Sequence, residues 1–318
     1  MILLKILLAW YTVTGVLLFF YAWRGIVAAW REPVLKRPVI IIESDDWGAG
    51  PVEQATAIKQ ISHVLEKFAD RDRCRPVMTL GVILATADGE KTLSSGDYYR
   101  HVISPDTHGP LLEAIKSGVE AGVFSIQLHG MEHYWPPALL LASKTDKTVM
   151  DWLAHSPQLQ TEKLPSPLQS RWVDASILPS QRLDSNAVKQ AAHEEVNAFK
   201  KIFGTAPRVA VPPTFIWTED VENAWAASGI KVVITPGSRF ESRDESGRPA
   251  SKGRAIHNGQ SSEKKIVYLV RDDYFEPSLG HTAVQALGRL SAKTRLGRPT
   301  LYETHRFNFL GSEGKRNS

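Results

Sequence analysis

The fold is indicated most clearly by the stretch Val39-Ile40-Ile41-Ile42-Glu43-Ser44-Asp45-Asp46-Trp47-Gly48. Its apolar first half is typical of a buried strand in a parallel sheet. The acidic pair Asp45-Asp46 follows where that strand ends. In α/β enzymes, functional side chains gather at the carboxyl ends of parallel strands. The stretch therefore predicts a polar site at that edge of a sheet.

A second strand-like run, residues 125–128, leads directly into His129-Gly130-Met131-Glu132-His133. One carboxylate with two imidazoles binds a divalent metal and leaves positions open for water and substrate. A second carboxylate beside the ligand can take a proton from that water. Alone, a carboxylate pair is common in turns and at helix caps, and histidines four apart often share one helix face. Together the two motifs predict a metal-dependent hydrolase.

The rest of the chain alternates between helical and strand patterns. Helices are expected at residues 52–68, 110–122, 187–203, 219–228 and 282–290. Further strands are expected at residues 77–84, 209–211, 231–234, 265–270 and 300–304. This alternation predicts an α/β fold with a parallel sheet or barrel. A chain of 318 residues can form such a fold as one domain, here residues 39–318.

Two stretches interrupt this alternation. Residues 134–184 are rich in Pro, Leu, Trp and Ser and follow the histidine pair directly. They are expected to form an insertion that covers the site, with an ordinary surface loop as the alternative. Residues 238–264 are polar and rich in charges, Gly and Ser, and are expected to form a mobile loop.

The N-terminal residues 1–30 are predicted to anchor the chain in a membrane as a single helix. Residues 2–30 are apolar apart from Lys5 and Arg24, and aromatic residues lie near both ends of the uninterrupted part. A cleaved signal peptide is the alternative. Residues 31–38 then form a linker.

The side of the membrane stays open. Arg31, Lys36 and Arg37 after the apolar segment favour a cytoplasmic domain by the positive-inside rule, whereas the function developed below favours an extracytoplasmic one. Cys74 is the only cysteine, which excludes an internal disulfide and a cysteine-based zinc site. The net charge is +4 without basic runs that alternate with aromatics, so nucleic acid is not an expected partner.

In the order of its motifs, the chain resembles the NodB-type polysaccharide deacetylases (carbohydrate esterase family 4) over residues 39–309. Ser44-Asp45-Asp46 is similar to the first motif of that family, and His129 to His133 is similar to its His-x-x-x-His motif. The third motif resembles residues 204–213, which end in Pro212-Pro213 and precede a helix and a glycine. The resemblance implies a distorted parallel (β/α) barrel.

The resemblance also implies a role for each matched residue. Asp46, His129 and His133 would hold the metal, most often zinc; Asp45 would be the general base, and His305 the acid that protonates the leaving amine. The implied reaction is removal of acetyl groups from N-acetylated glycans. Two alternatives remain: a hydrolase of the same fold acting on another amide, an ester or a glycoside, or a non-catalytic protein of envelope assembly or glycan binding.

The chain departs from the family pattern before the double proline, where Val211 stands in place of the usual arginine and Arg208 lies three residues earlier. Arg271 and Asp273, at the end of another strand, are candidates to support the site; a solvated strand end is the alternative. From the matched motifs, Trp47 and Pro213 are expected to bind substrate or support the site. The chain ends 13 residues after His305, which indicates a trimmed barrel or a shortened product.

Overall fold

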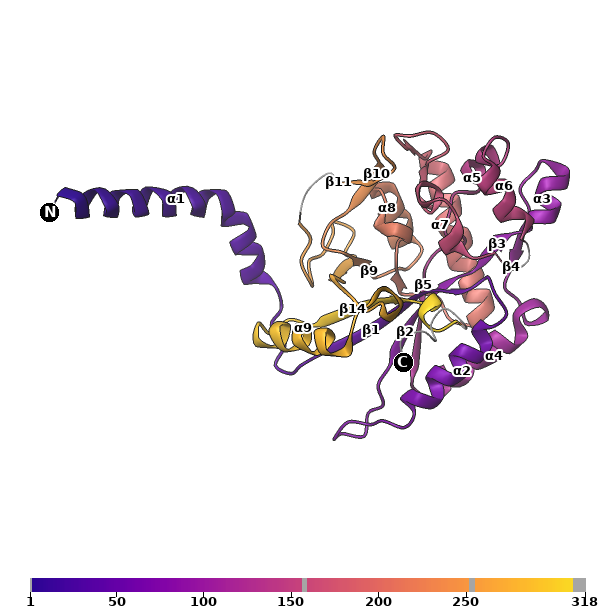
Figure 1. The fold of residues 1–318 in the computed structure, drawn as a ribbon, viewed down its shortest axis with the longest axis horizontal. Coiled ribbons are helices and arrows are strands. Elements are labelled where there is room, and N and C mark those ends of the chain that lie inside the picture. The colour runs from indigo at the N-terminus through magenta and orange to yellow at the C-terminus, as the bar shows by residue number, and fades with distance from the viewer. Residues whose placement is uncertain (1, 156–158, 252–254, 311–318) are drawn as a thin grey trace.

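The computed structural model describes residues 2–155, 159–251 and 255–310 (Figure 1). One parallel sheet forms the centre of the globular part, in the order β12 (Val267–Val270), β9 (Val232–Thr235), β8 (Val209–Ala210), β5 (Phe124–Leu128), β2 (Met78–Ile83), β1 (Ile40–Gly48), β14 (Thr300–His305) and β13 (Asp273–Tyr274). Every neighbouring pair in this sheet is parallel.

The two edges of this sheet belong to one stretch of chain. β12 pairs with β9, and β13 begins three residues after β12 ends but pairs with β14 at the opposite edge. The sheet therefore curls round until residues 267–274 link its two ends. This confirms the expected α/β fold with a distorted parallel barrel.

Helices connect successive strands of the sheet: α2 (Gln54–Leu65), α4 (Pro105–Glu120), α7 (Ser185–Phe203), α8 (Glu219–Ala227) and α9 (Ala283–Arg295). α2 packs against α4, and α7 packs against α8. The buried stripe of α2 includes Ala57, Ile58 and Ile61, at the spacing of one helix face. α7 begins at the N-cap Asp184 and ends at Gly204, whose φ of 76° suits a glycine C-cap.

The region after the histidine motif contains regular structure: α5 (Pro136–Ala142), α6 (Lys147–Ala154), η1 (Thr161–Lys163), η2 (Ser166–Leu168), β6 (Val173–Asp174) and β7 (Gln181–Arg182). Of these elements, α5 and α6 lie at one end of the body together with α3 (Gly89–Ser95) and the hairpin of β3 (Ala85–Ala87) and β4 (Arg100–Val102) (Figure 1). Tyr134, Leu139, Trp152 and Leu153 belong to a separate small core there.

The stretch 238–264 differs from the loop that was expected. It contains an antiparallel hairpin of β10 (Phe240–Arg243) and β11 (Pro249–Ser251), and residues 252–254 of that stretch lie outside the described residues. Arg243 is buried and its Nη1 donates to the carbonyl oxygen of Gly247 at 2.6 Å. The expected loop therefore includes a short hairpin, and the buried arginine is bonded to the turn between its two strands.

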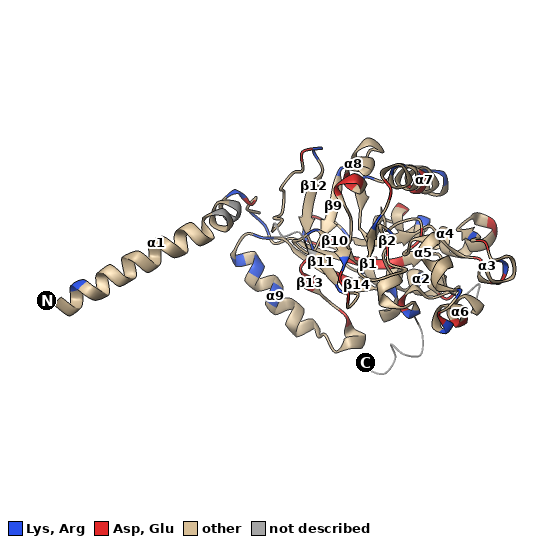
Figure 2. Cartoon of the chain, turned by 90° about the horizontal axis from the view of Figure 1, so that it is seen from above, with Lys and Arg blue, Asp and Glu red and all other residues tan. Residues whose placement is uncertain are grey.

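Helix α1 (Ile2–Arg31) extends away from the globular part (Figures 1 and 2). Its segment Ile2–Trp23 has a mean hydropathy of 2.0, and none of it is buried against the domain. Length and composition suffice to cross a membrane, although a signal sequence at this position has the same properties.

Candidate metal centre and active site

The acidic pair lies in an irregular part of β1. The register between β1 and β2 shifts between Ser44 and Trp47, and Asp46 has a φ of 70°. Such a bulge redirects side chains, and a non-glycine residue in this conformation costs about 1–3 kcal/mol. The result is that the adjacent side chains of Asp45 and Asp46 line the same cavity, whereas in a regular strand they would alternate between faces.

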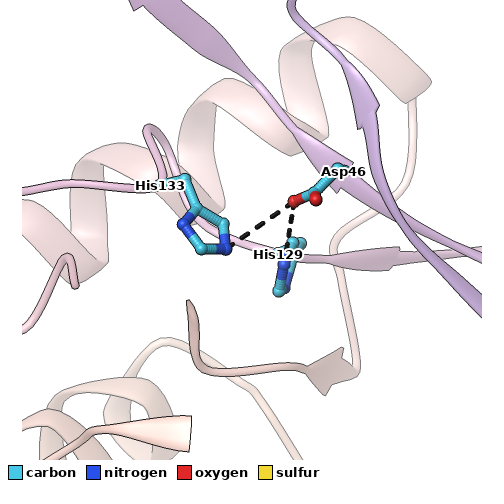
Figure 3. Close-up of side chains that lie close together, drawn as sticks. All are labelled: Asp46, His129 and His133. Carbon is cyan, nitrogen blue, oxygen red and sulfur yellow. Dashed lines mark ion pairs between the residues drawn. The ribbon is translucent and has the colours of Figure 1, made fainter. Parts of the chain in front are cut away.

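The two histidines reach Asp46 from the loop that follows β5. The Nε2 atoms of His129 and His133 lie 3.5 Å and 3.6 Å from Asp46 Oδ1, and the three side chains point toward one another (Figure 3). All three residues are buried, and their donor atoms lie within 4.8 Å of one another. The structure therefore brings together the predicted Asp-His-His group.

These three residues fit a divalent cation. His129 Nδ1 donates to the carbonyl oxygen of Val211 at 3.0 Å, which leaves Nε2 to offer its lone pair once the ring is neutral. Asp46 Oδ1 is buried and has no hydrogen-bond partner. Buried polar atoms are normally paired, so an acceptor facing two imidazoles marks a place for a cation.

The pKa values of the two histidines differ. Burial outweighs nearby Asp46 and lowers the pKa of His133 to about 4, so this ring is neutral at pH 7. For His129, burial is outweighed by Asp45 and Asp46 together, which raise its pKa. A cation bound here would have to displace that proton, because a metal ligand must be deprotonated.

Arg271 holds the second carboxylate of the pair. It lies between β12 and β13, and its Nη2 donates to Asp45 Oδ2 at 2.6 Å. Burial favours the neutral acid, but Arg271 outweighs it and holds the pKa of Asp45 below its usual value. Oδ1 of Asp45 has no hydrogen-bond partner. Arg271 thus contacts the acidic pair directly, while Arg208 is exposed.

Two further carboxylates, which sequence reasoning missed, share Arg271. Its Nη1 donates to Glu43 Oε2 at 3.3 Å, and its Nε lies 3.4 Å from Glu303 Oε2. Burial is the main cause that raises the pKa of Glu43 to about 7. Strand periodicity could have revealed both residues, because Glu43 and Asp45 are two apart on β1 and their register partners on β14 are Glu303 and His305.

His305 lies at the end of β14 and lines the same cavity. Its Nδ1 lies 2.6 Å from Glu276 Oε1, and its ring stacks on Phe307. Burial lowers the pKa of His305, but the bond to Glu276 and the charges of Asp46 and Glu303 outweigh burial and raise it to about 10. The side chain is therefore a charged imidazolium at neutral pH, held in one orientation.

The cavity that these residues share has a volume of about 360 Å³. Its remaining walls come from the Pro-Pro loop, the insertion and the strand ends: Pro212, Thr214, Phe215, Glu162, Gln169, Tyr274 and Phe307. Glu162 of the insertion pairs with the buried Arg306 through both carboxylate oxygens, at 3.0 Å and 3.1 Å. Part of the insertion thus forms one wall of the cavity.

Three predicted supporting residues lie elsewhere. Trp47 is fully buried and donates to Ser44 Oγ at 2.8 Å, so it packs the core and cannot bind substrate. Pro213 is also buried and is absent from the cavity wall, to which its neighbour Pro212 contributes. Asp273 pairs with Lys293 of α9 at 2.5 Å and does not line the cavity. These three residues therefore do not line the cavity.

A second buried ionic group, the Glu132 network, lies behind the histidine loop. Arg171 pairs with Glu132 and, through Nε at 3.0 Å, with Glu195 Oε2. Glu195 also accepts from the backbone N–H of Met131 at 3.1 Å and from Trp225 Nε1 at 2.7 Å. None of these residues lines the cavity. The network therefore ties the histidine loop to α7 and to the insertion.

Comparison with known proteins gives one family match. The family profile described as glycosyl hydrolase family 57 matches residues 84–282, more than half of the chain. The matched range includes His129, His133 and Arg271 but neither the acidic pair on β1 nor His305. This family differs from the one suggested by the motifs, although both point to a carbohydrate-related hydrolase fold. No curated protein matches the chain in sequence.

Several solved structures resemble the chain weakly. The 4-alpha-glucanotransferase from Thermococcus litoralis is 9% identical with a TM-score of 0.42; the match covers 86% of this chain, which spans only 34% of the transferase. The family 4 carbohydrate esterase from Streptomyces lividans is 10% identical with a TM-score of 0.37, covering 87% and 82%. The family 4 acetyl xylan esterase from Clostridium thermocellum is 12% identical with a TM-score of 0.33, covering 85% and 89%.

Proposed function

The chain belongs to glycosyl hydrolase family 57, and from that starting point we propose that it is a metal-dependent hydrolase that removes acetyl groups from N-acetylated glycans. One observation carries this proposal: Asp46, His129 and His133 converge on one point, with a second carboxylate beside it. We further propose that α1 anchors the enzyme in a membrane.

Asp46 Oδ1 and the Nε2 atoms of His129 and His133 would hold the cation, and zinc suits this set of two imidazoles and a carboxylate. When bound, zinc supplies a Lewis acid for the acyl carbonyl and lowers the pKa of water. The buried Asp46 Oδ1, which has no hydrogen-bond partner and faces both Nε2 atoms, supports this assignment.

Asp45 would act as the general base. Arg271 fixes one of its oxygens and keeps the carboxylate charged, while the other oxygen has no partner and can accept a proton from the attacking water. Glu43 and Glu303 share the charge of Arg271 with Asp45, so these two glutamates set how strongly Arg271 holds Asp45.

His305 would donate a proton to the leaving nitrogen. Its hydrogen bond with Glu276 uses Nδ1, so the proton would come from Nε2, which lies 3.5 Å from Glu303 Oε1. An imidazolium with a pKa of about 10 carries that proton throughout the neutral range. The aromatic side chains of Phe215, Tyr274 and Phe307 in the cavity wall offer flat apolar surfaces to a sugar ring.

Hydrolysis of a glycosidic bond is the second candidate function, because the family match favours it. Such reactions use two carboxyl groups on either side of the scissile bond. Asp45, Asp46, Glu162 and Glu303 all line the cavity and could supply such a pair. The convergence of two buried histidines on Asp46 has no part in that chemistry, which is why deacetylation ranks first.

The test is to incubate the full chain with an N-acetylated glucosamine oligomer, with zinc and after chelation, and to measure both acetate and oligomer length. Deacetylation predicts zinc-dependent release of acetate with unchanged length. Shorter oligomers without acetate, formed equally after chelation, would favour the glycosidase. If the zinc-loaded chain altered neither these oligomers nor acetylated esters, a non-catalytic role would be supported instead.

A further inference from the structure

The linker between α1 and the domain is docked on the domain surface. Glu32 accepts from Arg298 Nη2 at 3.0 Å and from Asn258 Nδ2 at 3.0 Å, and the N–H of Leu35 donates to the carbonyl oxygen of Gly297 at 2.7 Å. These contacts hold the end of α1 next to the end of α9 (Figure 1). If α1 crosses a membrane, the surface of that membrane lies close to α9.

The outer face of α9 carries apolar side chains with no partner in the domain. Val284 and Leu287 are 79% and 63% exposed, and Leu296 just after the helix is 67% exposed. No residue of α9 is buried, because only one side of the helix contacts the sheet. Val284, Leu287 and Arg295 lie on one face, because at 3.6 residues per turn their spacings of three and eleven residues are close to whole turns. This is an amphipathic helix whose apolar side faces solvent.

The same region is basic. α9 contains no acidic residue, and basic side chains lie along it and at the end of α1 (Figure 2). Lys293 and Arg289 are engaged with Asp272 and Asp273. Arg31, Lys36 and Arg295 are exposed, and no ion pair involves them among the residues that the structure describes.

We propose that α9 and the linker form a juxtamembrane surface, defined by Val284, Leu287, Leu296, Arg31, Lys36 and Arg295, that binds an anionic lipid bilayer. Apolar side chains that insert at the headgroup level, flanked by basic ones, are the features of interfacial helices. Each basic side chain near an anionic surface strengthens such binding about fivefold. The surface would hold the barrel in one orientation relative to the bilayer.

The experiment uses the full chain in nanodiscs of phosphatidylcholine alone or with about one third phosphatidylglycerol. Amide hydrogen exchange is followed in α9 and, as an internal reference, in α2. We expect exchange in α9 to slow about fivefold or more in the anionic discs, with α2 unchanged. Arg31→Gln, Lys36→Gln and Arg295→Gln together should remove this difference, and Leu287→Ser should reduce it.

A matched variant removes three exposed lysines elsewhere: Lys144→Gln, Lys147→Gln and Lys189→Gln near α6 and on α7. It should keep the slow exchange of α9 in anionic discs. Equal exchange of α9 in both kinds of disc would overturn the proposal, and so would equal slowing of exchange in α2. A matched variant that also lost the difference in α9 exchange between the discs would overturn it as well. Protein that does not stay with the discs would overturn both this surface and the anchor.

Discussion

Two buried ionic clusters share the histidine loop, and they differ in how their charges are paired. In the Glu132 network, Arg171 lies between two carboxylates, and backbone and tryptophan N–H groups complete the hydrogen bonds of Glu195. In the metal-site cluster of Asp46, His129 and His133, Asp46 Oδ1 and His133 Nδ1 have no hydrogen-bond partner. The residue types are similar, and both clusters are buried.

The difference indicates what each cluster does. Internally satisfied charges stabilise a fold but have nothing to offer a ligand, whereas unpaired acceptors beside a cavity cost stability unless something binds them. The Glu132 network lies outside the cavity and the metal-site cluster lines it. We therefore expect substitutions in the first to change stability and those in the second to change binding and catalysis.

The largest effect is expected from Asp46→Asn. A neutral amide is a poorer ligand for a divalent cation than a carboxylate, so zinc and detectable acetate release should both be lost. Zinc content and acetate release are the two measurements. A variant that keeps zinc would show that Asp46 is not a metal ligand.

Asp45→Asn and His305→Ala should each retain zinc but lower kcat by about 10²–10⁴-fold, the usual contribution of a general base or acid. The measurement is acetate release beside zinc content. An Asp45→Asn protein without zinc would show that the roles of the two aspartates had been exchanged.

Arg171→Met should leave the buried Glu195 without an ionic partner and Glu132 with Arg100 alone. Removing one partner from a buried ion pair lowers the free energy of unfolding by about 3–5 kcal/mol. Urea unfolding should show that loss, while zinc affinity of the folded fraction should change little. Unchanged stability with lost zinc would reverse the roles assigned to the two clusters.

Gly81→Ala tests the packing of the general base. A Cβ atom at Gly81 on β2 would lie 2.3 Å from Asp45 Oδ1, which Arg271 prevents from moving freely. Relieving this contact by moving the Asp45 carboxylate about 1 Å should lower kcat about 10²-fold, with zinc retained. Gly288→Ala on α9 is the control, because an added Cβ there meets nothing within 4 Å. Equal activity of both variants would contradict the assigned position of Asp45.

The smallest effect concerns pH, since the His305 side chain is 25% exposed and solvent screens its charge. Its folded pKa of about 10 exceeds the ordinary 6.5. Its contribution to stability is therefore complete below about pH 6.5 and is lost as the pH rises towards 10. Glu276→Gln should lower the pKa of His305 by roughly one to three units, measurable by NMR titration. An unchanged titration would argue against the Glu276 contact.

Much of the site could be predicted from sequence, because its main residues follow apolar runs that end at the same edge of a parallel sheet. This reasoning predicts Asp45, Asp46, His129, His133 and His305, and the structure places all five around one cavity. What surrounds them could not be found so directly. Arg271 reaches Asp45 only because residues 267–274 bring it beside β1 across the interior, and Glu276 meets His305 through a turn of irregular chain.

Adjacency in the sequence predicts the cavity residues less well than position at a strand end does. Trp47 and Pro213 adjoin site residues, but the bulge in β1 and the turn after β8 direct their side chains into the core. Asp273 follows Arg271 by two residues, yet it pairs with α9. The periodicity of a strand predicts which side chains share a face; it does not predict which bulge redirects them.

X-ray absorption on the zinc-loaded full chain tests the central claim most directly. The account predicts one zinc per chain, bound by two imidazoles and by oxygen at about 2.0–2.2 Å. It also predicts that one imidazole is lost in His133→Gln, whereas Glu132→Gln keeps both. No stoichiometric zinc, or a zinc site without imidazole ligands, would contradict the account.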